Sequence, residues 1–378
     1  MNILFVVSTL ASTGPTNQLY NIVQHMDKGL FSPMILTLSP EPKSSLLPRF
    51  EQRGIPVETL GLSRMAGALV GASRLRGFVD KTKPDAVHTN GIRADMLAAS
   101  CLKGTPLMAT LRSFPYHDYA MQYGRLQGTY MAWRHLNALR KIVCPVACSK
   151  TTARLVLNKC GLNLRVVQNG VDDSYFNTCS KEQQFLIREQ LGLPVEGRVF
   201  VSVGDLIIRK KPVVLIRSFL QSRACHNDTL LMIGDGHLRK ECEELVGGHP
   251  QIRFVGHVHN VNDYLKASDY FMSASVSEGL PNVVMEAMAS GLPAFLSEID
   301  SHREILEINP DAGHLVPVEN IDRFTALINE SERMDYERMS AAASDIIARH
   351  LNARNMSLKY QQLYRKFGNG ISQGNRNG

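Results

Sequence analysis

The sequence predicts an α/β protein built from two doubly wound, Rossmann-like domains. With 378 residues the chain is longer than one ordinary compact domain. Short apolar runs alternate with helix-length segments, which is the βαβ pattern of a parallel sheet covered by helices on both faces. The same rhythm restarts after residue 195. We therefore expect two such sheets, one in each half of the chain.

The candidate strands are short runs rich in Val, Ile and Leu, as expected for strands that are buried on both faces. Those of the first half are NILFVVS, PMILTLS, DAVHTNG, LMATLRS, IVCPVACS and LRVVQNG. Those of the second half are RVFVSVGDL, TLLMIGDG, IRFVGH, YFMSAS and AFLSEI. The helices between the second set are expected to begin near Pro212, His237, Asn260 and Pro281.

The boundary between the domains is predicted near residue 171. The segment NGVDDSYFNTCS is rich in Asn, Asp, Gly and Ser, and a helix with a capping box from Ser180 to Gln183 follows it. The last helical pattern is amphipathic, and the residues after it have nothing to bury. The expected parts are domains at 1–170 and 171–350, a helix at 351–370 that returns to the first domain, and a disordered tail at 371–378.

Composition excludes several classes of protein. Hydrophobic residues make up 44% of the chain and charged residues 20%, so a disordered protein is excluded. No apolar run approaches the roughly 18 residues of a membrane span, and MNILFVVSTL lacks the basic start and cleavage site of a signal peptide. Seven cysteines without a C-x-x-C pair indicate reduced thiols. These features favour a cytoplasmic protein.

The net charge of +7 would attract nucleic acid, anionic lipid or phosphorylated ligands alike. The sequence has no RNP-type aromatic signature, no zinc-finger spacing and no long basic tract, so nucleic acid is the least favoured of the three.

Three loops of the second half have the character of a phosphate site. Ligands of open α/β sheets bind outside the carboxyl ends of the strands, where the loops read DLIIRKK, DGHLR and VSEGLP. Glycines allow close backbone approach to a phosphate, and Lys or Arg supplies the countercharge. Lys210 is therefore a candidate diphosphate ligand, with a surface charge as the alternative. For Gly234 and Gly236 a simple tight turn is the alternative to ligand contact.

The third loop runs into a helix that starts after Pro281 and ends before Gly291. Its unpaired N–H groups and dipole form an anion site. Glu286 lies one turn, about 5.4 Å, beyond Asn282 on the same face, so a phosphate at the terminus would leave a ribose beside it. Glu278 in the loop can hold hydroxyls of a group on the other phosphate. The pattern predicts a nucleotide-sugar site, with a solvated helix surface as the alternative.

In these motifs and their order the chain resembles the retaining glycosyltransferases of the group 1 type (glycosyltransferase family 4), and the resemblance covers nearly the whole chain. Glu278 and Glu286 match the E-x7-E signature of that family. The matches to its other motifs are Gly204, Leu206 and Lys210 in G-R-L-x-x-x-K, residues 234–236 in G-x-G, and residues 169–172 in N-G-V-D.

The resemblance implies the GT-B fold, in which two Rossmann-like domains face each other across a cleft. It implies that Lys210 binds the diphosphate, that Glu286 binds the ribose, and that Glu278 holds the donor sugar near the reacting carbon. The other expected donor-binding positions are Gly14, Gly204, Arg209, Lys211, Gly234, Gly236, Gly279, Leu280 and Pro281.

The sequence departs from the family at two donor-binding positions. Asp205 stands where the family usually has Arg, and Arg209 or Lys211 is expected to replace the missing cation. The loop after the first strand reads STGPTN in place of a double glycine, and Gly14 is expected to let it approach the diphosphate across the cleft.

Arg112 takes the place of a His that the family often has at the end of a strand in the first domain. An Arg stays protonated and cannot act as a general base. In the front-face displacement that the family implies, the leaving phosphate oxygen itself takes the acceptor proton. Arg112, Lys210 and Glu278 are therefore the predicted catalytic residues, with Arg112 stabilising charge on the diphosphate; a structural salt bridge is its alternative. The residues expected to line the acceptor are His88, Asn90 and His117, with a structural role as the alternative for the two histidines.

The chain contains no D-x-D pair, so we expect no metal requirement and no cofactor apart from the nucleotide-sugar donor, for which the family favours UDP. The acceptor is expected to be a saccharide, and a lipid-linked one in particular. The segment from Tyr123, YGRLQGTYMAWRHLNALRK, mixes aromatic and basic residues at helical spacing and could lie on an anionic membrane. An ordinary domain helix is the alternative.

The sequence as a whole predicts a retaining glycosyltransferase of cell-surface polysaccharide biosynthesis, such as O-antigen or capsule, at the inner face of the cell membrane. The transferred sugar is expected to be a hexose or an N-acetylhexosamine. An NAD-dependent oxidoreductase is disfavoured because G-x-G-x-x-G is absent after the first strand. A sugar-nucleotide epimerase of similar fold and a non-catalytic nucleotide-sugar binding protein remain as alternatives.

Overall fold

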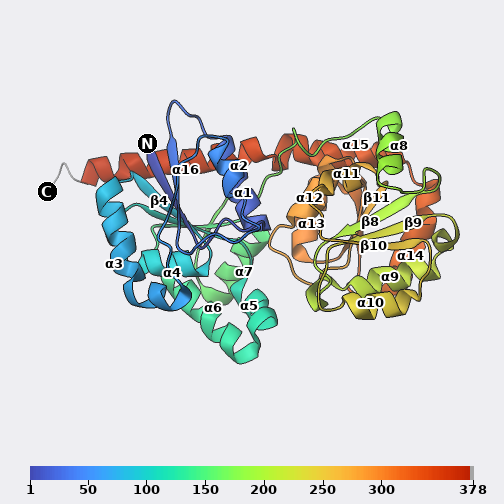
Figure 1. The fold of residues 1–378 in the computed structure, drawn as a ribbon, viewed down its shortest axis with the longest axis horizontal. Coiled ribbons are helices and arrows are strands. Elements are labelled where there is room, and N and C mark those ends of the chain that lie inside the picture. The colour runs from blue at the N-terminus through green and yellow to red at the C-terminus, as the bar shows by residue number, and fades with distance from the viewer. Residues whose placement is uncertain (375–378) are drawn as a thin grey trace. The chain divides into compact units, whose positions relative to one another are not determined.

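The structure, a computed structural model, describes residues 1–374 of the chain. It divides into two compact units, each built around its own sheet (Figure 1). Unit 1 consists of Met1–Gly170 and the chain from Ala353 onward, and unit 2 is Val171–Asn352. The pairings between strands are parallel in both sheets, so the predicted α/β class with two Rossmann-like domains is confirmed.

The sheet of unit 1 has seven strands in the order β3-β2-β1-β4-β5-β6-β7. The strands are β1 (Asn2–Val7), β2 (Ser32–Thr37), β3 (Val57–Thr59), β4 (Ala86–Asn90), β5 (Leu107–Leu111), β6 (Cys144–Ala147) and β7 (Arg165–Val166). The helices are α1 (Gly14–Gln24), α2 (Leu47–Glu51), α3 (Arg64–Thr82), α4 (Ile92–Cys101), α5 (Pro115–Tyr123), α6 (Arg125–Leu139), α7 (Lys150–Cys160) and α16 (Ala353–Gly374).

Alternate side chains of β1 enter two different cores, because successive residues of a strand point to opposite faces of the sheet. Phe5 packs with residues of α1 and α16. Leu4 and Val6 pack with residues of α3, α4 and α6. A strand with helices on both faces has no polar side, which explains why its sequence is continuously apolar.

The last helix, α16, belongs to unit 1, where it packs against α1. Its side chains Tyr360 and Tyr364 are completely buried. The helix extends to Gly374, past residue 371, where the disordered tail was expected to begin. Disorder of the tail stays a prediction. The rest of the predicted tail, residues 375–378, lies outside the described residues.

The sheet of unit 2 has six strands in the order β10-β9-β8-β11-β12-β13. The strands are β8 (Val199–Val203), β9 (Thr229–Ile233), β10 (Ile252–Gly256), β11 (Tyr270–Ser273), β12 (Ala294–Ser297) and β13 (Gly313–Val316). The helices are α8 (Lys181–Gln190), α9 (Pro212–Gln221), α10 (Arg239–Val246), α11 (Val261–Lys266), α12 (Asn282–Ala289), α13 (Asp300–Leu306), α14 (Ile321–Glu330) and α15 (Tyr336–Ile346). The shorter turns are η1 (Ile208–Lys210), η2 (Arg223–His226), η3 (Pro310–Ala312), η4 (Ser331–Arg333) and η5 (Ile347–Leu351).

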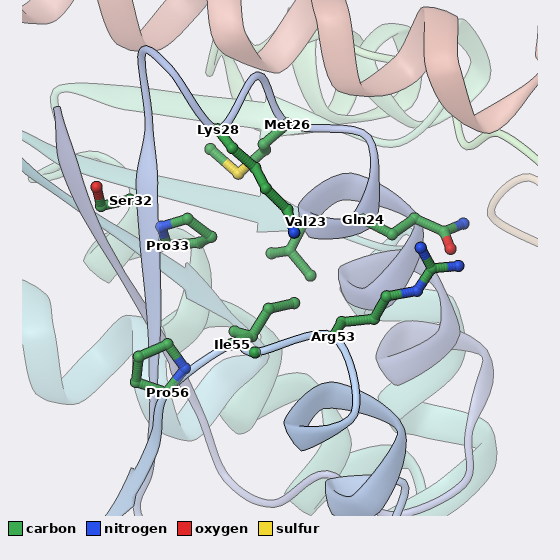
Figure 2. Close-up of a pocket in the computed structure, with 10 residues that line it drawn as sticks. Val23, Gln24, Met26, Lys28, Ser32, Pro33, Arg53, Ile55 and Pro56 are labelled. Carbon is green, nitrogen blue, oxygen red and sulfur yellow. The ribbon is translucent and has the colours of Figure 1, made fainter.

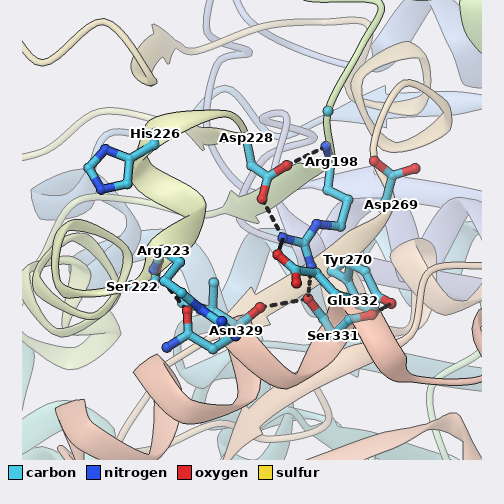
Figure 3. A network of polar contacts seen from close by, with 12 residues as sticks. Arg198, Ser222, Arg223, His226, Asp228, Asp269, Tyr270, Asn329, Ser331 and Glu332 are labelled. Carbon is cyan, nitrogen blue, oxygen red and sulfur yellow. Dashed lines mark hydrogen bonds and ion pairs between the residues drawn. The ribbon is translucent and has the colours of Figure 1, made fainter.

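A polar network lies at the amino end of the unit 2 sheet (Figure 3). Arg198, directly before β8, contacts Asp228 at 2.5 Å and Glu332 at 3.0 Å, and it donates to the Oγ of Ser331 at 2.6 Å. These contacts join η4 to the start of the central strand. The network is structural and leaves the opposite, carboxyl end of the sheet to ligands.

Candidate functional site

The loops after β8 and β9 pack backbone against backbone at the carboxyl end of the unit 2 sheet. The N–H of Gly204 donates to Ile233 and the N–H of Leu206 donates to Asp235, at 2.8 and 2.9 Å. A Cβ at Gly234 would clash with the carbonyl of Gly204, and a Cβ at position 236 would clash with that of Leu206. Close packing of the two loops therefore accounts for the glycines at 234 and 236, and ligand contact by them stays a prediction.

Two of the predicted cations meet the first glutamate of the E-x7-E pair. The Oε1 atom of Glu278 is 2.6 Å from the Nζ of Lys210 and 2.8 Å from a guanidinium nitrogen of Arg209. Arg209 also donates to the carbonyl of Ser277 at 2.8 Å, which fixes η1 against the loop after β11. We refer to Arg209, Lys210 and Glu278 as the ion-pair cluster.

The ion-pair cluster keeps Glu278 negatively charged. Burial alone would raise the pKa of this carboxyl, but the charges of Lys210 and Arg209 outweigh it and lower the pKa to about 2. The side chains of Lys210 and Glu278 are only 19% and 11% exposed. A diphosphate would compete with Glu278 for the same two cations, since both groups are anionic acceptors.

The structure does not bring every predicted cation into the ion-pair cluster. Lys211 forms an ion pair with Glu319 at 2.8 Å, and its backbone adopts a left-handed φ of 50° at the start of α9. Asp205 is exposed in the loop after β8. Of the two expected replacements for the missing Arg of the family, Arg209 lies in the cluster and Lys211 is bonded elsewhere.

The helix α12 begins where the proline predicted it. Pro281 is its N-cap, and its side chain forms no capping hydrogen bond. Pro281 and the neighbouring Gly279 and Leu280 are buried, so they shape the loop that carries Glu278. Glu286 lies one turn into the helix and is partly buried, and no described residue forms a hydrogen bond or ion pair with its carboxylate. Burial raises the pKa of Glu286 to about 7.

The raised pKa of Glu286 makes stability depend on pH. A carboxyl whose pKa is higher in the folded than in the unfolded state destabilises the fold as it ionises, so stability falls as pH rises from about 4.5 to about 7. We expect Glu286→Gln to raise Tm at pH 8 and to leave it nearly unchanged at pH 4.5. Thermal denaturation of both proteins across this range checks the prediction. An equal effect at both pH values would contradict it.

Sequence reasoning missed one polar residue beside the ion-pair cluster. His302, in α13, is completely buried. Its Nδ1 lies 2.8 Å from the carbonyl oxygen of Ser297. The charges of Glu278 and Lys210 both affect the pKa of the imidazole, so the ring lies within electrostatic reach of the cluster. The segment DSHREIL resembles an ordinary polar helix start, and only the tertiary fold shows that this histidine points inward.

In unit 1, Arg112 lies at the carboxyl end of β5 and is held by two amide oxygens. It donates to the Oδ1 of Asn169 at 2.8 Å and to the Oδ1 of Asn90 at 2.9 Å. No carboxylate pairs with Arg112 among residues 1–374, so the salt bridge considered as its alternative role is not observed. Gly14 begins α1 and is exposed.

The assignment of His88 to the acceptor site is wrong. Its side chain is completely buried. Its Nδ1 contacts the Tyr364 hydroxyl at 2.6 Å, and its Nε2 contacts the Thr110 hydroxyl at 2.8 Å. Burial first, and the nearby Arg112 second, lower the pKa of His88 to about 3, so it is neutral. Sequence periodicity could not show that α16 would cover this histidine.

The other two predicted acceptor residues lie closer to the surface of unit 1. Asn90 is 7% exposed at the end of β4, where it positions Arg112. His117 is exposed on α5, with its ring edge-on to that of Phe114 at 4.9 Å. Acceptor contact by either residue stays a prediction.

A separate pocket of unit 1, of about 300 Å³, lies at the amino ends of β2 and β3, with the side chain of Lys28 extending into it (Figure 2). No predicted site residue lines it. Ligands of such sheets bind at the other, carboxyl end, so we do not assign substrate to this pocket.

Two features that the described part of the chain lacks bear on the site. No group of three or more His, Cys, Asp or Glu side chains is placed there to hold a metal ion. No helix within residues 1–374 is both long and apolar enough to span a bilayer. The prediction that activity needs no metal stays a prediction.

Cations and a helix N-terminus gathered at the carboxyl ends of parallel strands are typical of nucleotide-binding α/β proteins. Two sequence families narrow this class: Glycosyltransferase Family 4 matches residues 12–175, and Glycosyl transferases group 1 matches residues 197–331. The chain belongs to these glycosyltransferases and has the GT-B fold.

Individual relatives are similar to this chain over most of their length. The UDP-Gal:alpha-D-GlcNAc-diphosphoundecaprenol alpha-1,3-galactosyltransferase of Escherichia coli is 24% identical over 76% of each chain. The putative teichuronic acid biosynthesis glycosyltransferase TuaC of Bacillus subtilis is 28% identical over 68% of this chain and 67% of its own. The structure of Anabaena HepE in complex with UDP-glucose superimposes with a TM-score of 0.81 at 18% identity, covering 97% of this chain and 100% of HepE.

Proposed function

We propose that the protein is a retaining glycosyltransferase that moves a hexose or N-acetylhexosamine from a UDP-sugar to a lipid-linked saccharide in cell-surface polysaccharide biosynthesis. The ion-pair cluster beside the start of α12 carries this proposal, because it offers a diphosphate two cations and a helix N-terminus together. The E. coli galactosyltransferase and B. subtilis TuaC, named above, support the donor and the pathway, and the UDP-glucose complex of HepE supports the nucleotide.

The residues of the cluster and the neighbouring Glu286 each have a distinct part in this reaction. Lys210 and Arg209 bind the diphosphate and neutralise the charge that develops as the sugar leaves. Glu286 accepts hydrogen bonds from the ribose hydroxyls. Glu278, kept ionised by its neighbours, accepts hydrogen bonds from the donor sugar near the reacting carbon.

Retention follows from a front-face displacement. The bond between the anomeric carbon and the acceptor oxygen forms on the face from which the phosphate oxygen departs, and that oxygen takes the acceptor proton. No protein base is needed. The reaction requires no divalent metal, so activity in excess chelator should equal activity in its absence.

Arg112 is proposed to stabilise the negative charge of the departing diphosphate. It has no acidic partner among the described residues, so its charge is available to an anion. We expect Arg112→Gln to lower kcat by about 10²-fold, the loss typical of removing one electrostatic stabiliser. Steady-state kinetics check this, with Arg338→Gln, at an exposed ion pair with Asp311, as the matched control. Unchanged turnover of Arg112→Gln would eliminate the role.

Incubation with UDP-, GDP- and ADP-linked sugars, with and without a lipid-diphosphate saccharide, tests the proposal. We expect one of the donors to release its nucleotide, and only when the acceptor is present. An α-linked donor should give an α-linked product. Conversion of one nucleotide sugar into another without acceptor would indicate the epimerase instead. Binding without any turnover would indicate a non-catalytic protein.

The helix α6 presents a surface suited to a membrane. Leu126, Tyr130 and Trp133 are 90%, 57% and 55% exposed and recur along one side of the helix. The rings of Tyr130 and Trp133 stack at 6.2 Å, and Arg134 lies 5.9 Å from the Tyr130 ring. We propose that this surface contacts the inner face of the cell membrane, where a lipid-linked acceptor is found.

Flotation with vesicles tests the membrane surface. We expect the protein to float with vesicles that contain anionic phosphatidylglycerol, and the variant Tyr130→Ala with Trp133→Ala to lose most of this binding. The matched control replaces Phe185 and Leu186, two exposed apolar residues of unit 2, with alanine. Equal flotation of both double variants would exclude α6 as the contact.

A further inference from the structure

The start of α13 contains two buried polar atoms that no described residue satisfies. They are the Nε2 of His302 and the Oγ of Ser301. Leaving such atoms without a partner costs roughly 1–3 kcal/mol each, so each calls for a physical explanation. Both belong to consecutive residues that follow β12, whose carboxyl end lies on the same edge of the sheet as the ion-pair cluster.

The hydrogen bond on the other side of the ring fixes which nitrogen carries the proton. The backbone carbonyl of Ser297, 2.8 Å from Nδ1, can only accept, so Nδ1 carries hydrogen. The hydroxyl of Ser297 donates elsewhere, to the carbonyl of Ser275 at 2.5 Å. Burial is the main cause that lowers the pKa of His302, to about 4, so the ring is neutral at physiological pH. Nε2 therefore presents a lone pair and can only accept.

A second acceptor lies in the neighbouring cluster. Lys210 and Arg209 both bind the Oε1 atom of Glu278, and its Oε2 has no hydrogen-bond or ion-pair partner among residues 1–374. An ionised carboxylate and a neutral imidazole lone pair at the same edge of the sheet suit a group with several hydroxyls, each of which can donate. They do not suit a phosphate or a carboxylate, which offer only acceptors at this pH.

We infer that the Nε2 of His302 accepts a hydrogen bond from a hydroxyl of the donor sugar, and that His302 thereby determines which sugars are accepted. The inference rests on the proposed function. A diphosphate that attracts Lys210 and Arg209 away from Glu278 would open the path to Nε2 for the sugar. The group that enters must be a hydrogen-bond donor, so a sugar with a free hydroxyl at that position is selected over one that lacks it.

Two substitutions separate this role from a structural one. Asn in place of His302 can keep a donor for the Ser297 carbonyl but has no atom at the position of Nε2. Gln reaches that position and can offer an oxygen acceptor. We expect H302N to weaken binding of UDP-glucose about 3- to 10-fold, the range for one neutral hydrogen bond, with the affinity for UDP unchanged. H302Q should restore much of the lost affinity.

The experiment measures Kd for UDP and UDP-glucose by calorimetry on wild type and both variants of the full chain. Monodeoxy analogues of UDP-glucose, tested on the wild type, give an independent test if a variant does not fold. One of them should bind more weakly than UDP-glucose by the factor expected for H302N. Equal weakening of UDP and UDP-glucose, or no loss with any deoxy analogue, would overturn the inference. Failure of the wild type to bind any nucleoside diphosphate would instead contradict the proposed function.

Discussion

Replacing Lys210 with alanine lowers kcat/KM for the sugar donor by about 10²- to 10³-fold, the loss expected when one charge-stabilising donor is removed from a partly buried site. Two effects combine. The diphosphate loses one of two cations in the cluster, and Glu278 keeps only Arg209 as a charged partner. Initial rates of nucleotide release at varied donor concentration measure the effect.

The matched control for this prediction is Lys240→Ala. Lys240 is 89% exposed and forms only a loose contact of 3.7 Å with Glu244, so its removal should leave kinetics unchanged. Circular dichroism of both variants excludes unfolding as the cause of a loss. If Lys210→Ala and Lys240→Ala had the same activity, the ion-pair cluster would not be the donor site.

Replacing His135 with leucine destabilises unit 1 by about 3–5 kcal/mol, the cost of removing one partner of a buried ion pair or charged hydrogen bond. His135 on α6 is 2% exposed and lies 2.7 Å from Asp95 on α4, which is completely buried. The other nitrogen of the ring contacts the Tyr119 hydroxyl of α5 at 2.8 Å. Without His135 the carboxylate of Asp95 would be buried with no partner.

Denaturant unfolding followed by fluorescence of the single tryptophan, Trp133 on the same helix, reports this loss. The control is the double variant His135→Leu with Asp95→Leu, which removes the stranded charge and should recover most of the lost stability. If the double variant were less stable than His135→Leu alone, packing around α6 and not the buried charge would be the cause.

The fold could be predicted from the sequence wherever a strand lies inside its sheet. Such strands are apolar on both faces, and all eleven runs chosen for this reason contain a strand. The two that were missed, β3 and β13, are edge strands. β3 has two exposed residues out of three, and β13 begins at Gly313, where a Cβ would clash with the carbonyl of Ala294. Edge strands are often short and carry polar or charged residues, so they can lack the continuous apolar run of an interior strand.

In the candidate site, only residues in loops that directly follow strands could be predicted from the sequence. The loops after β8 and β11 follow strands, so Lys210 and Glu278 could be expected at one sheet edge, and they meet there. The partners of Lys211 and His88 could not be predicted, because Glu319 and Tyr364 are distant in the sequence. His302 was missed for the same reason, since its burial depends on the neighbours of β12.

The place of α16 in unit 1 has a consequence for biosynthesis. The ribosome makes residues 1–170, then all of unit 2, and only then the helix that completes the first core. Translation proceeds at about 5–20 residues per second. The surface of the N-terminal half that later packs against Tyr360 and Tyr364 is therefore exposed to solvent for on the order of ten seconds or more. A premature stop codon before Ala353 would therefore yield a product that exposes this surface permanently, making it a client for chaperones and proteases.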